Sequence, residues 1–321
     1  MGSANQTATF HAFTPKAALE LTSPPSWPAS LGPVFVGGAA AFAFNRFLPF
    51  TMDWRAAVCW ILMLFIAVLM QSAVNTLNDY KDFNSGLDTA ETVLDKSDAS
   101  IVYNQINPKD ALRFAIFLLA AAAVLGVVVV LLSNWVLIVI GVLAAAVLVL
   151  YSFGPRPISS LPLGEVFSGI VMGGCITVAT YMALTTAFIP QVLLVTVPPI
   201  LSVAMVMLTN NTCDIDRDIE AGRKTLAILL GRQRAAVLEA TLATITLLWM
   251  AAMGFFFWMS ALIMALGATL MCFRRLRLFL HGAYSLENRR VMMSNVSAWC
   301  AIISVCWFIG LLVGGLVESL A

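Results

Sequence analysis

Two short polar segments repeat one pattern of carboxylate and amide side chains. Residues 75–82 read NTLNDYKD and residues 211–218 read NTCDIDRD, so both fit N-T-x-[N/D]-x-x-[K/R]-D. Positions i, i+3 and i+7 share one face of a helix. The faces predicted in this way carry Asn75, Asn78 and Asp82 in the first segment, and Asn211, Asp214 and Asp218 in the second.

The chemistry that such faces favour is the binding of a hard cation. Carboxylates one helical turn apart repel each other, so we expect a cation between them. Oxygen ligands without His or Cys suit Mg²⁺, which typically takes one or two carboxylates together with substrate phosphates. A phosphorylated substrate is therefore expected. The basic residues placed to neutralise its remaining charge are Lys81, Lys96, Arg156, Arg223 and Lys224.

Not every acid near the second segment can point at the same site. Asp216 lies about 200° around the helix from Asp214, on the face that it shares with Glu220. We expect these two side chains to face water or to pair with neighbouring Arg and Lys residues.

The elements that position these residues must be membrane helices. The chain of 321 residues is 60% hydrophobic and 11% charged, with a mean hydropathy of +0.92, which is outside the range of soluble globular proteins. Continuous apolar runs without period-2 alternation predict helices and an all-α fold. About nine spans are expected, at residues 16–44, 55–77, 111–132, 134–152, 163–186, 190–209, 235–254, 256–273 and 292–316.

The first expected span is interrupted by Pro24, Pro25 and Pro28. A broken membrane helix is tolerated where it lines protein or a cavity, so this break is expected to border a site. The polar stretch before it argues against a cleaved signal peptide. We expect one domain over 1–321, with a polar tail at 1–15 and cytoplasmic motif-bearing loops at 78–110 and 210–234.

The distribution of basic residues predicts the orientation. With nine spans, 16 of the 18 Lys and Arg residues lie on one side and only Arg46 and Arg55 on the other, which makes the first side cytoplasmic. Both acidic segments stand at cytoplasmic ends of spans, and four helices separate them. We therefore expect a repeated four-helix unit around a central cavity, a cytoplasm-facing site, and a multi-pass protein of a bacterial cytoplasmic (inner) membrane.

Other features exclude some functions. The net charge is +1, so no field favours nucleic acid as a partner. The six cysteines lack CxxC spacing and predict neither a metal site nor a disulfide framework. The partners expected are the lipid bilayer and the substrates, and the sequence sets no oligomeric state.

Three segments resemble the UbiA superfamily of intramembrane aromatic prenyltransferases. NDYKDFNSGLD (78–88) and NNTCDIDRDIEAGRKTLAILLG (210–231) resemble its two aspartate-rich motifs. YSFGPRPISSLPLGEVFSGIVMGG (151–174) is most similar to the dihydroxynaphthoate polyprenyltransferases of menaquinone synthesis, with their Y-x-x-G-P-x-P and L-G-E pattern. The resemblance implies that Mg²⁺ holds a prenyl diphosphate between the motifs. It also implies prenylation of an aromatic acceptor, in the naphthoate branch with loss of CO₂.

The resemblance also implies roles for individual residues. Metal and diphosphate would be held by Asn78, Asp82, Asp88, Asn211, Asp214 and Asp218, with Asp79 as a further metal candidate at a variable position of the family. Arg223 falls where the family commonly has Lys, and Lys224 follows it. Tyr151 and Arg156 are candidates for diphosphate binding, with interfacial anchoring as the alternative.

Several alternatives remain open at this point. The family usually has Asp-Arg after the first motif, whereas this chain continues DTAETVLDKSDASIVYNQINPKDAL, so either Lys96 replaces the Arg or the loop serves another acceptor. Such acceptors include 4-hydroxybenzoate and other quinone or lipid precursors. A non-enzymatic lipid carrier is a further alternative, as is a transporter, which the rim position of the acids disfavours.

Overall fold

The computed structural model describes residues 10–86, 88–89, 99–152, 154 and 157–320. These residues form helices joined by short loops, and no strand occurs among them apart from an isolated bridge between His11 and Ile106. The all-α membrane fold is therefore confirmed. Two of the expected site residues, Lys96 and Arg156, lie outside the described part of the chain.

Seven of the described helical segments are long and apolar enough to cross a membrane. They are α3 (Trp54–Asn84), α5 (Pro108–Leu132), the continuous segment Gly164–Thr185, α9 (Val192–Cys213), α12 (Arg232–Phe256), α13 (Met259–His281) and α14 (Arg289–Leu320). Two further apolar helices, α2 (Pro28–Ala43) and α6 (Val136–Ser152), are shorter. The 16 residues of α2 span about 24 Å, less than a hydrocarbon core of about 30 Å. The count of nine full spans is thus not confirmed.

The expected first span is divided into three pieces. α1 (Pro15–Leu21) is followed by the 3₁₀ turn η1 (Pro24–Ser26) and then by α2, and Ser23 at the break has a left-handed φ of 47°. The side chain of Asn75 in α3 holds this break, because its amide nitrogen donates to the carbonyl of Thr22 at 2.8 Å and to Ser26 Oγ at 2.9 Å. The break therefore contacts the first acidic segment through Asn75, whose side chain stabilises the broken backbone.

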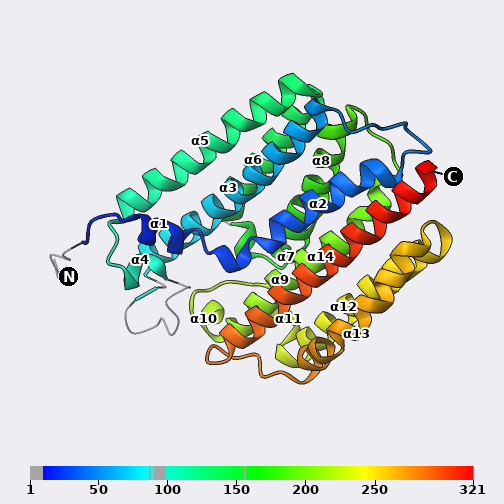
Figure 1. Cartoon of the computed structure of the whole chain (residues 1–321). Helices are drawn as coiled ribbons and strands as arrows, with labels where there is room; N and C mark the ends of the chain where they lie inside the picture. Colours follow the sequence, from blue (N-terminus) through cyan, green and yellow to red (C-terminus); the bar gives the residue numbers. More distant parts are fainter. Residues whose placement is uncertain (1–9, 87, 90–98, 153, 155–156, 321) are drawn as a thin grey trace, which may run out of the picture.

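The long helices lie side by side, and α9 is central, in contact with α2, α12 and α14 (Figure 1). Gly164–Thr185 consists of α7 (Gly164–Ser168), the π-helical turn η3 (Gly169–Cys175) and α8 (Ile176–Thr185). The turn η3 packs closely on α9, where a Cβ on Gly173 would lie 2.6 Å from the backbone of Ile200.

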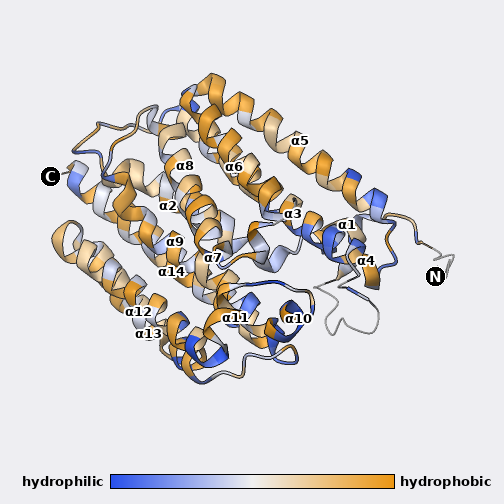
Figure 2. Ribbon diagram, turned by 180° about the vertical axis from the view of Figure 1, so that it is seen from behind, coloured by the Kyte–Doolittle hydropathy of each residue, from blue (hydrophilic) through white to orange (hydrophobic). Residues whose placement is uncertain are grey.

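The short helices gather at one end of the molecule. These are α4 (Ser100–Tyr103), α10 (Ile215–Glu220) and α11 (Leu226–Leu230) (Figure 1). The 3₁₀ turn η2 (Ile158–Ser160) is joined to the segment between α10 and α11 by a hydrogen bond from the Lys224 N–H to the carbonyl of Ser160. Hydrophilic residues are concentrated around α1, α4, α10 and α11, whereas the long helices are largely hydrophobic (Figure 2). The C-terminal ends of α3 and α9, which carry the two acidic segments, reach this polar end.

Candidate active site

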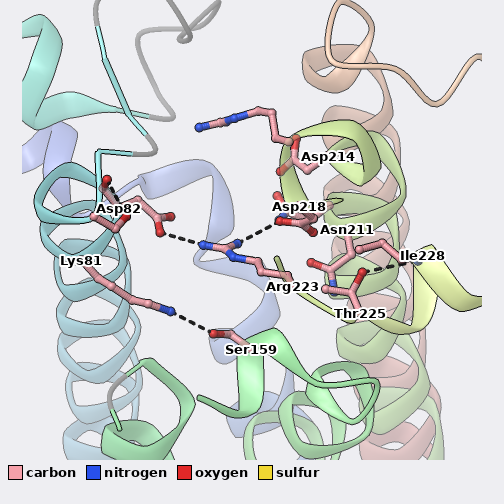
Figure 3. A network of polar contacts seen from close by, with 12 residues as sticks. Lys81, Asp82, Ser159, Asn211, Asp214, Asp218, Arg223, Thr225 and Ile228 are labelled. Atoms are coloured by element: carbon pink, nitrogen blue, oxygen red, sulfur yellow. Dashed lines mark hydrogen bonds and ion pairs between the residues drawn. The ribbon is translucent and has the colours of Figure 1, made fainter. Parts of the chain in front are cut away.

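One arginine joins the two acidic segments. The Arg223 guanidinium contacts Asp82 Oδ1 at 2.8 Å and Asp218 Oδ1 at 3.1 Å, from opposite sides (Figure 3). Asp82 belongs to the last turns of α3, and Asp218 belongs to α10. The side chain of Asp218 is 3% exposed and that of Asp82 is 24% exposed. Asp82 and Asp218, which occupy equivalent positions of the repeated pattern and are 136 residues apart in the sequence, therefore contact a single cationic group.

A glycine turn brings Arg223 to this position. Gly222 has a φ of 70° at the end of α10, its N–H donates to the carbonyl of Ile219, and the Arg223 N–H donates to the carbonyl of Asp218 at 2.8 Å. This pair of hydrogen bonds is the Schellman motif, which favours glycine at the left-handed position. The backbone thus returns Arg223 towards the carboxylate that its side chain contacts.

The second acidic segment bends instead of continuing as one helix. α9 ends at Cys213 and α10 begins at Ile215, although the N–H of Asp218 still donates to the carbonyl of Asp214 at 2.9 Å. The predicted division into two faces is confirmed. Asn211, Asp214 and Asp218 are buried, whereas Asp216 is 76% exposed and pairs with Arg232, and Glu220 is exposed.

Arg289 is a member of the site that sequence reasoning missed. Its Nε lies 3.1 Å from Asp214 Oδ1 and its guanidinium also donates to Asn210 Oδ1. Arg289 begins α14, 75 positions beyond Asp214, and in the sequence it is one of a set of basic residues typical of a cytoplasmic membrane boundary. No local motif distinguishes it from that set, because the contact depends on how α14 packs against α9.

The electrostatics of Asp218 suit a cation. Its pKa is raised to about 6, chiefly by burial; Arg223 opposes the shift, and the negative charges of Asp214 and Asp82 add to it. Asp218 Oδ2 is buried and has no hydrogen-bond partner among the described residues. Additional positive charge beside this oxygen would favour the ionised form.

The residues fit Mg²⁺ bound together with a diphosphate better than a closed metal cage. Within the described ranges, no three His, Cys, Asp or Glu side chains converge as a ready-made metal site. Mg²⁺ commonly uses one or two protein carboxylates and completes its octahedron with water and phosphate oxygens. The all-oxygen donors and the unpartnered Asp218 Oδ2 are compatible with that mode of binding.

Two of the predicted basic residues contact the turn η2, and a third predicted residue, Tyr151, is buried. Lys81 Nζ donates to Ser159 Oγ at 3.3 Å (Figure 3), and the backbone N–H of Lys224 donates to the carbonyl of Ser160 at 2.9 Å. The hydroxyl of Tyr151 is buried without a hydrogen-bond partner in the part of the chain that the structure describes.

The two asparagines also have defined partners. Asn78 accepts a hydrogen bond from Ser152 at 2.6 Å, and Asn211 donates one to Glu165 at 2.8 Å. Glu165 is the glutamate of the L-G-E sequence and has no place among the predicted site residues.

Asp79 and Asp88 have other contacts. Asp79 Oδ2 accepts a hydrogen bond from the backbone N–H of Ser100 at 3.2 Å, at the start of α4. Asp88 Oδ1 lies 2.6 Å from Arg217 of α10, so this ion pair also connects the first segment to the second.

Several known proteins have similar sequences. The sequence pattern of the UbiA prenyltransferase family matches residues 30–298. The 1,4-dihydroxy-2-naphthoate octaprenyltransferase of Bacillus subtilis is 36% identical over 230 residues, which cover 72% of this chain and 71% of that protein. The human UbiA prenyltransferase domain-containing protein 1 is 31% identical, over 68% of this chain and 62% of that protein.

Solved structures of low sequence identity share the fold. A UbiA homologue from Aeropyrum pernix superimposes with a TM-score of 0.63 at 17% identity, covering 90% of this chain and 98% of that one. A UbiA homologue from Archaeoglobus fulgidus bound to GPP and Mg²⁺ gives a TM-score of 0.61 at 17% identity, covering 92% and 99%. With the family pattern covering most of the chain, these matches show that the protein is a membrane-embedded prenyltransferase and belongs to the UbiA prenyltransferase family.

Proposed function

We propose that this enzyme transfers a polyprenyl group from a prenyl diphosphate to 1,4-dihydroxy-2-naphthoate in an Mg²⁺-dependent reaction that releases CO₂ and gives demethylmenaquinone. The observation that carries the proposal is the contact of Arg223 with Asp82 and Asp218, which puts acids of both motifs around one small polar site. The acceptor is inferred from the names of relatives in Bacillus subtilis and Haemophilus influenzae, both 1,4-dihydroxy-2-naphthoate octaprenyltransferases.

The residues of the site supply binding and charge stabilisation. In the proposed reaction the bond between the first prenyl carbon and the diphosphate oxygen breaks, and the diphosphate leaves with the electron pair. Arg223 and Lys81 would stabilise the negative charge that develops on the diphosphate oxygens. Asp82, Asp214 and Asp218 would hold Mg²⁺, which supplies further positive charge at the leaving group.

The acceptor completes the reaction. An electron-rich ring carbon attacks the allylic cation and forms a carbon–carbon bond, and in the proposed acceptor this carbon loses its carboxylate as CO₂. The acids lie at the ends of the long apolar helices α3 and α9, and a pocket between such helices would protect the allylic cation from water, which would otherwise convert it to a prenol.

The proposed location is a bacterial cytoplasmic membrane, with the site facing the cytoplasm. Basic residues at the ends of α13 and α14, among them Arg274, Arg277 and Arg290, support this orientation, since they belong to the same end of the molecule as α10.

A reconstitution assay tests the function. Purified protein in detergent or vesicles would be incubated with Mg²⁺, a series of prenyl diphosphates and a panel of acceptors that includes 1,4-dihydroxy-2-naphthoate and 4-hydroxybenzoate. We expect release of diphosphate and CO₂ and a product with the mass of demethylmenaquinone, and we expect EDTA to abolish turnover until Mg²⁺ is restored.

Each other outcome has a defined meaning. Turnover with 4-hydroxybenzoate alone would replace the proposed acceptor and keep the reaction class. Turnover that persists in EDTA would contradict the proposed metal dependence. The lack of turnover with every acceptor, in a preparation that still binds prenyl diphosphate, would favour a lipid carrier.

A further inference from the structure

Two polar residues on either side of the loop between α6 and α7 each hold one asparagine of the paired motifs. Ser152, the last residue of α6, donates to Asn78 Oδ1 at 2.6 Å. Glu165, in the first turn of α7, accepts from Asn211 Nδ2 at 2.8 Å. Ser152 is 2% exposed, Glu165 4% and Asn211 6%. The contacts are therefore shielded from water and connect α6 and α7 to the ends of α3 and α9.

The chemistry of the partners determines which end of each amide remains available. Glu165 Oε1 accepts from the NH₂ group of Asn211, which leaves the carbonyl oxygen of Asn211 on the opposite side of the amide. Ser152 uses the carbonyl oxygen of Asn78, which leaves the NH₂ group available. The two asparagines occupy equivalent positions in the repeated pattern, but they present opposite chemical groups.

These groups suit different parts of an Mg²⁺–diphosphate complex. An amide oxygen is a ligand for Mg²⁺, whereas an amide N–H donates to a phosphate oxygen. Asn211 lies beside Asp218 and Arg223 (Figure 3), in the part of the site where the unpartnered Asp218 oxygen also lies. We propose that Glu165 is a positioning residue that turns the carbonyl oxygen of Asn211 towards Mg²⁺, while Ser152 turns the NH₂ group of Asn78 towards the diphosphate. This inference rests on the proposed function.

Glu165 offers two variants that separate position from charge. Glu165→Gln removes the charge but keeps a carbonyl oxygen at the same reach, so the hydrogen bond from Asn211 is retained. Glu165→Asp keeps the charge but shortens the side chain by one methylene, so that hydrogen bond is lost. The second carboxylate oxygen of Glu165 has no hydrogen-bond partner among the described residues, so Gln disturbs no other known contact there.

The experiment measures Mg²⁺ binding without relying on turnover. The thermal unfolding midpoint of purified protein would be followed as Mg²⁺ is added at a fixed concentration of geranyl diphosphate. For Glu165→Asp we expect the Mg²⁺ concentration that gives half of the stabilisation to rise roughly tenfold or more, as for other residues that orient metal ligands. For Glu165→Gln we expect a change of less than about threefold, because the Asn211 amide keeps its orientation.

Ser152→Ala provides the complementary variant. We expect it to raise the KM for prenyl diphosphate several-fold while the Mg²⁺ dependence at saturating diphosphate stays close to that of the wild type. Glu165→Ala serves as a second loss of the hydrogen bond, and its unfolding midpoint without ligands reports whether it is folded.

The outcomes distinguish this inference from the function on which it rests. If wild-type protein gains no stability from Mg²⁺ and geranyl diphosphate together, the proposed diphosphate site is wrong and the inference is wrong with it. If the wild type is stabilised but Glu165→Gln is impaired as strongly as Glu165→Asp, retaining the hydrogen bond to Asn211 does not preserve Mg²⁺ binding, and the positioning role is overturned. Unchanged Mg²⁺ dependence in Glu165→Asp would overturn it as well.

Discussion

At the scale of single residues, the site depends on carboxylates that one cation holds together. Asp82 and Asp218 would repel each other at this separation without Arg223, whose guanidinium contacts both. Burial, with a contribution from Asp214 and Asp82, raises the pKa of Asp218 to about 6 although Arg223 opposes the shift, so the ionised form is costly at this position. In the proposed reaction, Mg²⁺ bound with the substrate would add a second positive centre beside an oxygen that has no hydrogen-bond partner among the described residues. The acids are therefore arranged for a site in which cations and phosphate oxygens bind together.

Replacing a buried acid tests this arrangement against a neighbouring surface acid. We expect Asp218→Asn to lower kcat/KM roughly 10²–10³-fold, because it removes charge that would hold Mg²⁺ and orient Arg223. The matched control is Asp216→Asn, two positions away, whose side chain is 76% exposed and pairs with Arg232. That surface pair contributes little, so its activity is expected to stay within about twofold. Equal losses in the two variants would contradict the two-face interpretation.

The residues that could be predicted from the sequence share a local pattern. Asn78, Asp82, Asn211, Asp214 and Asp218 follow from repeated spacing along helices, and their segments meet at one end of the molecule. Arg289 and Glu165 could not be predicted in the same way. Their contacts with Asp214 and Asn211 join distant segments of the chain. In the sequence, Arg289 resembles a basic residue at a membrane boundary, and Glu165 resembles an acid in the first turn of a helix. Spacing within one helix carries no information about such contacts.

At the scale of elements, apolar run length predicts most helices but not their breaks. Runs of about 20 apolar residues correspond to the long helices, because an unpaired backbone is costly in lipid. The first expected span, however, includes α1 and η1, because proline residues begin new turns at Pro24 and Pro28. The bend between α9 and α10 at Asp214 has no proline or glycine to indicate it, and the carbonyl and amide hydrogen bonds around it are largely retained.

The turn after α10 offers an element-scale prediction. Gly222 and Gly231 both have positive φ angles, 70° and 73°, and a Cβ on either would meet no atom within 4 Å. Alanine therefore introduces backbone strain at both positions: about 1–2 kcal/mol at Gly222, in the left-handed helical region, and at least as much at Gly231, whose ψ of 159° puts it in a region that is nearly exclusive to glycine. Only Gly222 precedes the arginine that contacts Asp82 and Asp218. We expect both variants to lower the unfolding midpoint, Gly231→Ala at least as much as Gly222→Ala, and only Gly222→Ala to lower turnover, by about tenfold or more for a misplaced charged group.

This comparison separates strain from positioning. Turnover would be measured at a temperature below the unfolding midpoints of both variants, so that unfolding does not contribute to any loss of activity. If Gly231→Ala loses as much activity as Gly222→Ala, general destabilisation explains both results, and the turn has no specific role in placing Arg223.

At the scale of the whole molecule, charge is distributed in a way that fits one orientation. Arg46 and Arg55 are the two basic residues expected on the side away from the site, and each has partners within the protein. Arg46 pairs with Glu318 at 3.3 Å. Arg55 donates to the carbonyls of Leu132 and Leu184, at the ends of α5 and α8, where helix dipoles favour a cation. These two arginines are held by internal contacts and do not oppose a cytoplasmic location for the polar end.

Reporter fusions test this orientation. The C-terminal end of α14 lies at the opposite end of the molecule from α10 and α11 (Figure 1). If the site faces the cytoplasm, alkaline phosphatase fused after Leu320 is exported and active, whereas the same enzyme inserted after Gly222 stays reduced and inactive. Green fluorescent protein at the same two positions is the matched control, because it is expected to fluoresce only on the cytoplasmic side. Phosphatase activity at Gly222 together with fluorescence at Leu320 would invert the orientation. Activity of one reporter at both positions would place both ends on the same side and require an even number of crossings between them. One of α12, α13 and α14 would then not cross the membrane, contrary to what their lengths and compositions predict.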